Sequence, residues 1–301
     1  MRLLLAAFLT AAWSISYPLA AQETQIRLPK PAPAACVCIA TDDSCAGRLV
    51  ASTANFRIQW SASADELRAL AETCETQLAQ SKASWLGTAK SSVWVPQCEI
   101  VVHGDSAAYV ACLGPHSAQT SGCATIRIEQ GHVVLRRIDL AADALDWRTE
   151  SLPHELTHVV LADRFSTRRI SPWADEGIAM LAETAAKRNR RLTAVHASLE
   201  SGATYTVRDL MNVHTFPEPA LRNAFYGQSV ALVRQLLNWG TRKQLLDFVE
   251  ASQSQGPDAA LAAVYGNRAI AELDRQLADG LSSDRFVELA GATTTPAILR
   301  K

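Results

Sequence analysis

The five residues from His154 to His158, with the sequence HELTH, carry the clearest chemistry of this chain. Residues four apart share one face of a helix, so both imidazoles can point at one metal ion. Glu155 lies about 100° around that helix from His154, where it can reach a metal-bound water without being a ligand. The stretch predicts a zinc site with Glu155 as general acid/base. The alternative is a surface helix that carries two histidines by chance.

Glu176 is the residue we expect to complete the site, because catalytic zinc takes three protein ligands and keeps one position open. It lies eighteen residues after His158, in the segment WADEGIA. Pro172 favours the start of a helix there, and Gly177 leaves room for close packing on the motif helix. We therefore predict His154, His158 and Glu176 as the ligands of one Zn²⁺ per chain.

Other carboxylates near the motif leave alternatives open. Glu183 follows Glu176 by seven residues and would share its helix face, while Asp163 comes soon after the motif. Either is a rival third ligand. Asp175 could orient a ligand histidine, as carboxylates often do in zinc sites, or simply place a favourable charge at a helix start.

The expected chemistry is hydrolysis of a carbonyl compound. Bound zinc lowers the pKa of water toward about 7, and Glu155 would move the proton from that water to a departing amine. The oxyanion needs a second electrophile opposite the metal. Tyr226, which opens a helix, is our first choice, and His214, in a Thr- and Pro-containing loop, is the second. Ordinary packing is the alternative for Tyr226.

Residues 1–21 have the composition of an export signal, with Arg2, an apolar run over 3–13 and small residues before the expected cleavage point. The run is too short for a comfortable membrane span. We expect a periplasmic or extracellular protein without stable membrane insertion after cleavage. An uncleaved N-terminal anchor is the alternative.

The net charge and the cysteine content indicate which classes of partner and which redox compartment to expect. The net charge of −1 gives no sign of a nucleic-acid partner. Seven cysteines crowd the N-terminal half, which in an exported protein indicates disulfides rather than a structural zinc site. Their pairing and the oligomeric state stay open. The cysteines are Cys36, Cys38, Cys45, Cys74, Cys98, Cys112 and Cys123.

Periodicity divides the rest of the chain into two halves. Strands are expected at 56–60 and 99–103, a helix at 64–85, and a hairpin at 124–129 and 132–140 around Gln130-Gly131. Pro153 suits the first turn of a motif helix that runs to about residue 165. Further helices are expected at 226–237, 242–251 and 270–281.

These elements predict an α+β fold, with a small mixed sheet and its helices first, a mostly helical half second, and a zinc cleft between them. The expected organisation is a signal peptide at 1–21, a Pro/Cys-rich irregular arm at 22–53, an α/β sheet subdomain at 54–150, and a helical subdomain at 151–290 that carries both motifs.

The HELTH stretch, the WADEGIA segment and the later YGQS segment at 226–229 resemble the gluzincin clan of zinc metallopeptidases. The likeness is closest to small exported proteins with a peptidase MA-like domain, and it spans roughly residues 54–285. The resemblance implies His154, His158 and Glu176 as ligands and Glu155 as acid/base. It also implies a sheet edge that holds substrate by strand addition, either residues 124–129 or their hairpin partner.

Two departures from the clan's patterns matter. The Gly-x-Met-x-Asn motif of gluzincin aminopeptidases is absent, which favours an endopeptidase acting on peptide or protein substrates. Met180 stands where thermolysin has an acidic residue, so a partner that orients the histidine is not identified. An inactive zinc-binding scaffold that acts through protein contacts in the envelope is therefore the alternative function. A Cys-stapled envelope protein without metal is a third.

Overall fold

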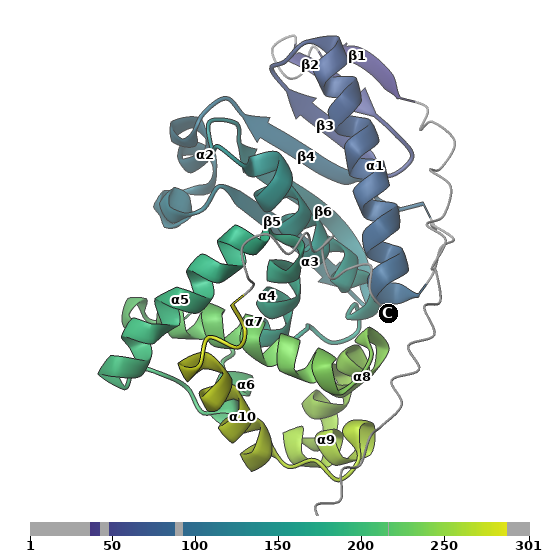
Figure 1. Cartoon of the computed structure of the whole chain (residues 1–301). Coiled ribbons are helices and arrows are strands. Elements are labelled where there is room, and N and C mark those ends of the chain that lie inside the picture. The colour runs from purple at the N-terminus through teal and green to yellow at the C-terminus, as the bar shows by residue number, and fades with distance from the viewer. Residues whose placement is uncertain (1–36, 43–47, 88–92, 216, 288–301) are drawn as a thin grey trace, which may run out of the picture. The chain divides into compact units, whose positions relative to one another are not determined.

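Six strands form one mixed sheet in the N-terminal half of the protein (Figure 1). The structure is a computed structural model that describes residues 37–42, 48–87, 93–215 and 217–287. The spatial order is β1-β2-β3-β4-β6-β5, with β3, β4 and β6 parallel and the other pairs antiparallel. The strands are β1 (Cys38–Asp42), β2 (Arg48–Ser52), β3 (Phe56–Trp60), β4 (Cys98–His103), β5 (Gly122–Glu129) and β6 (His132–Ala141).

Strands β1 and β2 lie in the segment that was expected to be an irregular arm, so that expectation is wrong for residues 38–42 and 48–52. They pair antiparallel with each other, and β2 continues the sheet onto β3. Each is only five residues long and gains its hydrogen bonds from a neighbouring strand, which local composition does not reveal. The other part of the proposed arm, residues 22–36 and 43–47, lies outside the described residues.

The predicted hairpin is confirmed in β5 and β6. Gln130 and Gly131 connect the strands with φ values of 50° and 78°, and two left-handed residues are what a tight primed turn requires. A register shift between Arg127 and Ile128 marks a bulge in β5. Strand β5 is also the last strand at its end of the sheet, so one side of its backbone has no strand partner among the described strands.

Helices α1 (Ala64–Leu86) and α3 (Leu152–Arg164) share the first hydrophobic core with one face of the sheet. A capping box of Ser63 and Glu66 starts α1, and Asp105 caps α2 (Ser106–Leu113) through a 2.7 Å bond from the Ala108 amide. The first core draws on β3, β4, β6 and both helices; among its members are Phe56, Ile58, Leu67, Leu78, Ile100, Ile138, Leu140, Leu156 and Val160.

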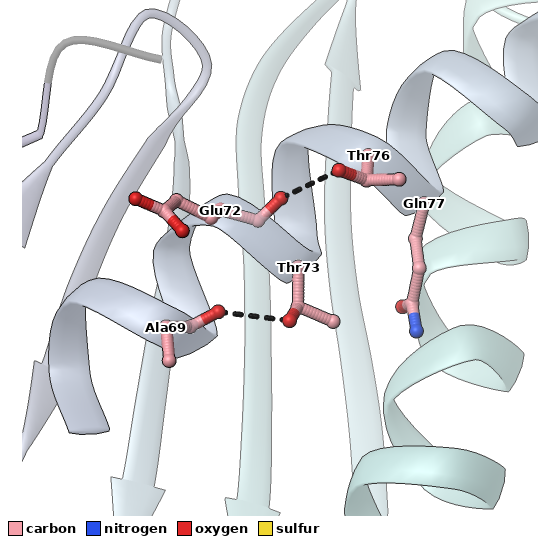
Figure 2. Close-up of a pocket in the computed structure, with 5 residues that line it drawn as sticks. All are labelled: Ala69, Glu72, Thr73, Thr76 and Gln77. Atoms are coloured by element: carbon pink, nitrogen blue, oxygen red, sulfur yellow. Dashed lines mark hydrogen bonds between the residues drawn. The ribbon is translucent and has the colours of Figure 1, made fainter. Parts of the chain in front are cut away.

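The exposed side of α1 carries a shallow hollow (Figure 2). The hydroxyls of Thr73 and Thr76 donate hydrogen bonds to the helix carbonyls of Ala69 and Glu72, at 2.8 and 2.9 Å. The two threonine hydroxyls are thus satisfied within the helix. The other polar groups that line the hollow are one carboxylate, that of Glu72, and the Gln77 amide, so the hollow holds no set of metal-ligand or nucleophilic side chains.

Helices make up the second half, as the periodicity predicts. Three of them extend the expected segments at 226–237, 242–251 and 270–281 by a few residues, and they surround a second hydrophobic core. The helices are α4 (Pro172–Ala179), α5 (Ala185–Ser201), α6 (Val207–Met211), α7 (Arg222–Trp239), α8 (Arg242–Gln255), α9 (Pro257–Tyr265) and α10 (Ile270–Ser282).

Helix α3 connects the two cores. Its residues Leu156 and Val160 belong to the sheet core, whereas Leu161 at its end and Phe165 just after it belong to the helical core. Figure 1 shows α3 beside β5 and β6, with α4 and α7 beyond it. The α+β prediction is thus confirmed, and the motif helix lies at the junction of the sheet and the helices.

Neither the predicted disulfides nor the predicted export signal gains support from the described residues. Their five cysteines, of which Cys74 and Cys98 are fully buried, are all free thiols, so the predicted disulfides are not seen there. Cys36 and Cys45 lie outside the described part, as does the predicted signal at 1–21. Within that described part, none of the helices is at once long enough and apolar enough to span a membrane.

Candidate metal centre

The motif helix begins as the sequence predicts and presents both imidazoles on one face. A single π-helical turn, Trp147–Ser151, leads directly into α3, and Pro153 occupies its first turn. The ring centroids of His154 and His158 are 4.9 Å apart with the rings nearly perpendicular. Spacing of four residues on a helix therefore does bring the two side chains together.

Glu176 of α4 completes a three-residue cluster with these histidines. One nitrogen from each imidazole and one Glu176 oxygen all lie within 4.8 Å of one another. His154 Nε2 is 3.5 Å from Glu176 Oε2. In a tetrahedral zinc site with bonds of about 2.1 Å, neighbouring ligand atoms are roughly 3.4 Å apart, so the cluster needs only small side-chain movements to fit that geometry.

Asp175 fixes the orientation of the second histidine. His158 Nδ1 and Asp175 Oδ1 are 2.8 Å apart, a hydrogen bond in which the ring N–H donates to the carboxylate. That bond commits Nδ1 and leaves Nε2 of His158 for a ligand. A carboxylate behind the imidazole is the usual companion of a metal-binding histidine, so the oriented ring fits a metal.

Glu183 occupies the equivalent place behind His154. Its Oε1 lies 3.1 Å from His154 Nδ1, although Nδ1 is too poorly aligned to count as hydrogen-bonded. Lys187 and Arg191 pair with the same carboxylate at 3.1 and 3.2 Å, and Glu183 is only 2% exposed. A small rotation of the His154 ring would align Nδ1 with the Glu183 carboxylate, and Nε2 already faces Glu176. This arrangement also suits a ligand histidine.

Carboxylates dominate the electrostatics of the two imidazoles. Burial opposes the charged form, but Glu176 and Glu183 outweigh it and raise the pKa of His154 to about 9. Asp175 and Glu176 likewise raise the pKa of His158 to about 10 against its burial. Burial raises the pKa of Glu176, yet the two histidines reverse that effect and lower it. The centre thus attracts positive charge, which a divalent cation would supply in place of two protons.

Glu155 faces the edge strand. The Ala124 amide of β5 donates a hydrogen bond to its carboxylate, but burial is the largest influence and raises the pKa of Glu155 overall. Gly122 permits this contact, because a Cβ there would lie 2.9 Å from Glu155 Cγ and 3.1 Å from Ser151 Cβ. A carboxyl with a raised pKa beside a metal cluster suits proton transfer near neutral pH.

Helix α7 borders the cluster on the far side of α4. A Cβ at Gly177 would lie 2.6 Å from the Ser229 carbonyl oxygen, so α4 packs closely on α7 there. This differs from the expectation that Gly177 serves packing on the motif helix. Tyr226 lies in the first turns of α7, with the Arg191 guanidinium 5.0 Å from its ring centroid. Burial and the charge of Glu176 both raise the pKa of Tyr226.

The rival residues lie elsewhere. Asp163 accepts bonds from Arg136 and the Trp94 indole at 2.7 Å each, outside the cluster. His214 is exposed in the loop after α6 and does not belong to the described group of ligand-type residues around His154. Glu183 approaches His154, but α4 ends at Ala179 and a short 3-10 turn follows, so Glu183 does not share the helix face of Glu176.

Two features of this centre were not predicted from the sequence. Glu183 was considered there only as a rival third ligand, whereas its position behind His154 Nδ1 suits an orienting role. Gly122 drew no notice, because its closeness to Glu155 depends on how β5 packs on α3. The basic residues Lys187 and Arg191, one turn and two turns after Glu183, were the available signal that this carboxylate is ionised and buried.

Comparison with known families agrees with this geometry. One family profile, described as the Peptidase MA superfamily, matches residues 127–279, which include His154, His158, Glu176 and Tyr226. The chain belongs to that superfamily, as the resemblance of its motifs implies. Membership groups it with peptidase-type hydrolases at the superfamily level. A search of curated proteins finds no match to its sequence.

Proposed function

We propose that this protein is a zinc-dependent endopeptidase of the gluzincin type. The observation that carries the proposal is the convergence of His154, His158 and Glu176 within 4.8 Å, with a carboxylate behind Nδ1 of each imidazole. That arrangement suits Zn²⁺, which takes neutral imidazole and carboxylate ligands. The zinc, when bound, would act as a Lewis acid and lower the pKa of a water toward about 7.

The roles of the protein's own groups follow from their positions. Glu155, whose pKa is raised, takes a proton from the attacking water and delivers it to the leaving amine. The Ala124 amide keeps that carboxylate in place. Tyr226 retains its proton because of its raised pKa, so its hydroxyl can donate a hydrogen bond to a developing oxyanion. Asp175 and Glu183 hold the two imidazoles in the orientation that ligation requires.

Action on internal peptide bonds is favoured by strand β5. It ends the sheet beside Glu155, and a peptide that paired with its free edge would need no terminal amine or carboxylate for recognition. The composition of residues 1–21 motivates the accompanying proposal of export to the periplasm or the extracellular space. The inactive-scaffold alternative loses one of its motives, because Asp175 and Glu183 supply the orienting carboxylates that seemed to be missing.

Glu155→Gln is the direct test. We expect the variant to bind zinc as the wild type does and to lose cleavage of a diverse peptide library by at least about 10²-fold, the lower bound of a general acid/base contribution. Glu200→Gln, on the exposed surface of α5, is the matched control and should retain full activity. Full activity of Glu155→Gln would refute the mechanism, and zinc binding by a wild type that cleaves nothing would favour the scaffold.

A further inference from the structure

A second group of metal-ligand types lies on the opposite face of the sheet from the hydrophobic core. Ile138 and Leu140 of β6 point into that core, so Asp139 between them points to the other face. Asp139 is fully buried there, because helix α2 packs over this part of β4 and β6. The register places Cys123 of β5 directly beside Asp139.

Three different ligand types converge at this point. His103 Nε2 lies 2.8 Å from Asp139 Oδ1, and Cys112 of α2 completes a set in which one atom from each residue lies within 4.8 Å of the others. The His103 side chain is 9% exposed and Asp139 is buried, whereas Cys112 is exposed. Two ligands are therefore fixed by the fold, and the third faces the solvent from which an ion would enter.

We propose that His103, Cys112 and Asp139 form a second binding site for a divalent metal ion of the zinc class. Imidazole, thiolate and carboxylate are each ligands that Zn²⁺ accepts, and the thiolate disfavours Mg²⁺ and Ca²⁺, which require oxygen ligands. With three protein ligands and an exposed side, the site leaves one position for water or for a further ligand.

The distances permit such a site with modest movement. Tetrahedral coordination sets ligand atoms roughly 3.4 to 3.7 Å apart for the usual zinc–nitrogen, zinc–oxygen and zinc–sulfur bonds. His103 and Asp139 must therefore separate from 2.8 Å by less than about 1 Å. Cys112 must close a gap of no more than 4.8 Å by up to about 1.2 Å, which a change of rotamer at an exposed helix position achieves.

Arg137 is the group that argues against the site, because its guanidinium bonds to both oxygens of Asp139 at 2.7 and 2.8 Å. A carboxylate oxygen has more than one acceptor direction, and ligating carboxylates are commonly hydrogen-bonded by neighbours. With a thiolate, a carboxylate and a divalent ion, the added guanidinium leaves a local charge of about +1. Arg137 therefore orients the Asp139 carboxylate, and its positive charge does not rule out a bound divalent ion.

The simpler explanation is a buried His–Asp–Arg hydrogen-bond network with an unrelated cysteine nearby. The two explanations differ in whether the Cys112 thiol takes part. A structural network does not involve its thiol, whereas the metal site bonds to it. None of the three proposed ligands belongs to the His154 cluster, so this inference does not rest on the proposed function and can fail or succeed separately.

Cobalt(II) substitution provides the test, because a thiolate bonded to cobalt gives a charge-transfer absorption that nitrogen and oxygen ligands do not. The full chain, reduced and freed of metal, is titrated with Co²⁺. We expect a thiolate charge-transfer band, which reports on this site alone. The total is two ions per chain if the His154 cluster also binds cobalt and one if it does not. The variant with both His154→Ala and His158→Ala should keep the band with one ion, and Cys112→Ser should lose the band and bind one ion fewer than the wild type.

Cys123→Ser is the matched control, because Cys123 is the cross-strand neighbour of Asp139 and so a rival thiol among the described residues. It should leave the band unchanged. Absence of a thiolate band in the wild type would overturn the proposal, and so would a band that survives Cys112→Ser. Since Cys112 is exposed, its replacement should not disturb folding, and an unchanged far-UV circular dichroism spectrum verifies this.

Discussion

Gly177 links the helix packing of this protein to its candidate metal centre. It follows Glu176 directly, and α4 approaches α7 so closely there that a Cβ would lie 2.6 Å from the Ser229 carbonyl oxygen and 2.7 Å from Val233 Cγ2. Ordinary contacts begin near 3.4 Å. Val233 can rotate, but the Ser229 carbonyl is part of a buried helix. Gly177→Ala must therefore push α4 away from α7 by about 0.8 Å, or tilt it by an equivalent amount.

Two effects follow from that displacement. Overpacking costs roughly 1–3 kcal/mol, and the better helix propensity of Ala returns about 1 kcal/mol, so the net loss of stability should not exceed about 2 kcal/mol. The effect on the site is larger, because zinc ligands tolerate deviations of only about 0.2 Å. If Glu176 is a ligand, we expect the zinc affinity to fall by about tenfold or more.

Competition with a chromophoric chelator measures that affinity, and thermal unfolding without metal measures the stability. The net destabilisation corresponds to a fall in Tm of at most about 4 °C for a chain of this size. Gly104→Ala is the control, since a Cβ there meets no atom within 4 Å, and it should change neither quantity. A Gly177→Ala protein with the zinc affinity of the wild type would show that the contact between α4 and α7 does not position Glu176 as a ligand.

Three further results are expected. Asp175→Asn should lower zinc affinity about 10- to 100-fold while leaving the fold intact, because it weakens the hydrogen bond that orients His158. Chelator competition measures this affinity, and an unchanged value would show that Asp175 does not support the site. Gly122→Ala should retain zinc but reduce peptide cleavage about tenfold, because its Cβ displaces the Glu155 carboxyl; equal losses of zinc and activity would contradict this separation. In Cys112→Ser, which leaves only the His154 centre to bind, zinc binding at pH 7 should release close to two protons. The raised pKa values of His154 and His158, about 9 and about 10, keep both rings protonated without metal, so affinity should rise with pH up to that range. Calorimetry in buffers of different ionisation enthalpy counts the protons, and a release near zero would contradict the third result.

The elements that the sequence predicts best are those whose evidence is local. Helical spacing over 64–85 and the Gln130-Gly131 turn each fix an element from within their own residues, and both agree with the structure. The HELTH spacing works in the same way, because four residues on a helix determine which side chains meet. Strands β1 and β2 were missed, since each depends on a partner that lies elsewhere in the chain.

The surroundings of the metal cluster were harder to predict for a related reason. Whether Glu183 binds an ion or orients His154 depends on the 3-10 turn that ends α4, which shifts it off the helix face of Glu176. The contact between Gly122 and Glu155 arises only when β5 packs against α3. Both are consequences of tertiary packing, and a single sequence does not encode them as a local pattern.

In the proposed enzyme, His154, His158 and Glu176 hold a zinc ion beside Glu155. A crystal of the Glu155→Gln variant with zinc, measured at the zinc absorption edge, would locate that ion. We expect an anomalous peak about 2.0–2.2 Å from Nε2 of both histidines and from a Glu176 oxygen. A peak bonded to Glu183 instead of Glu176, or no peak between the two imidazoles, would contradict this ligand set.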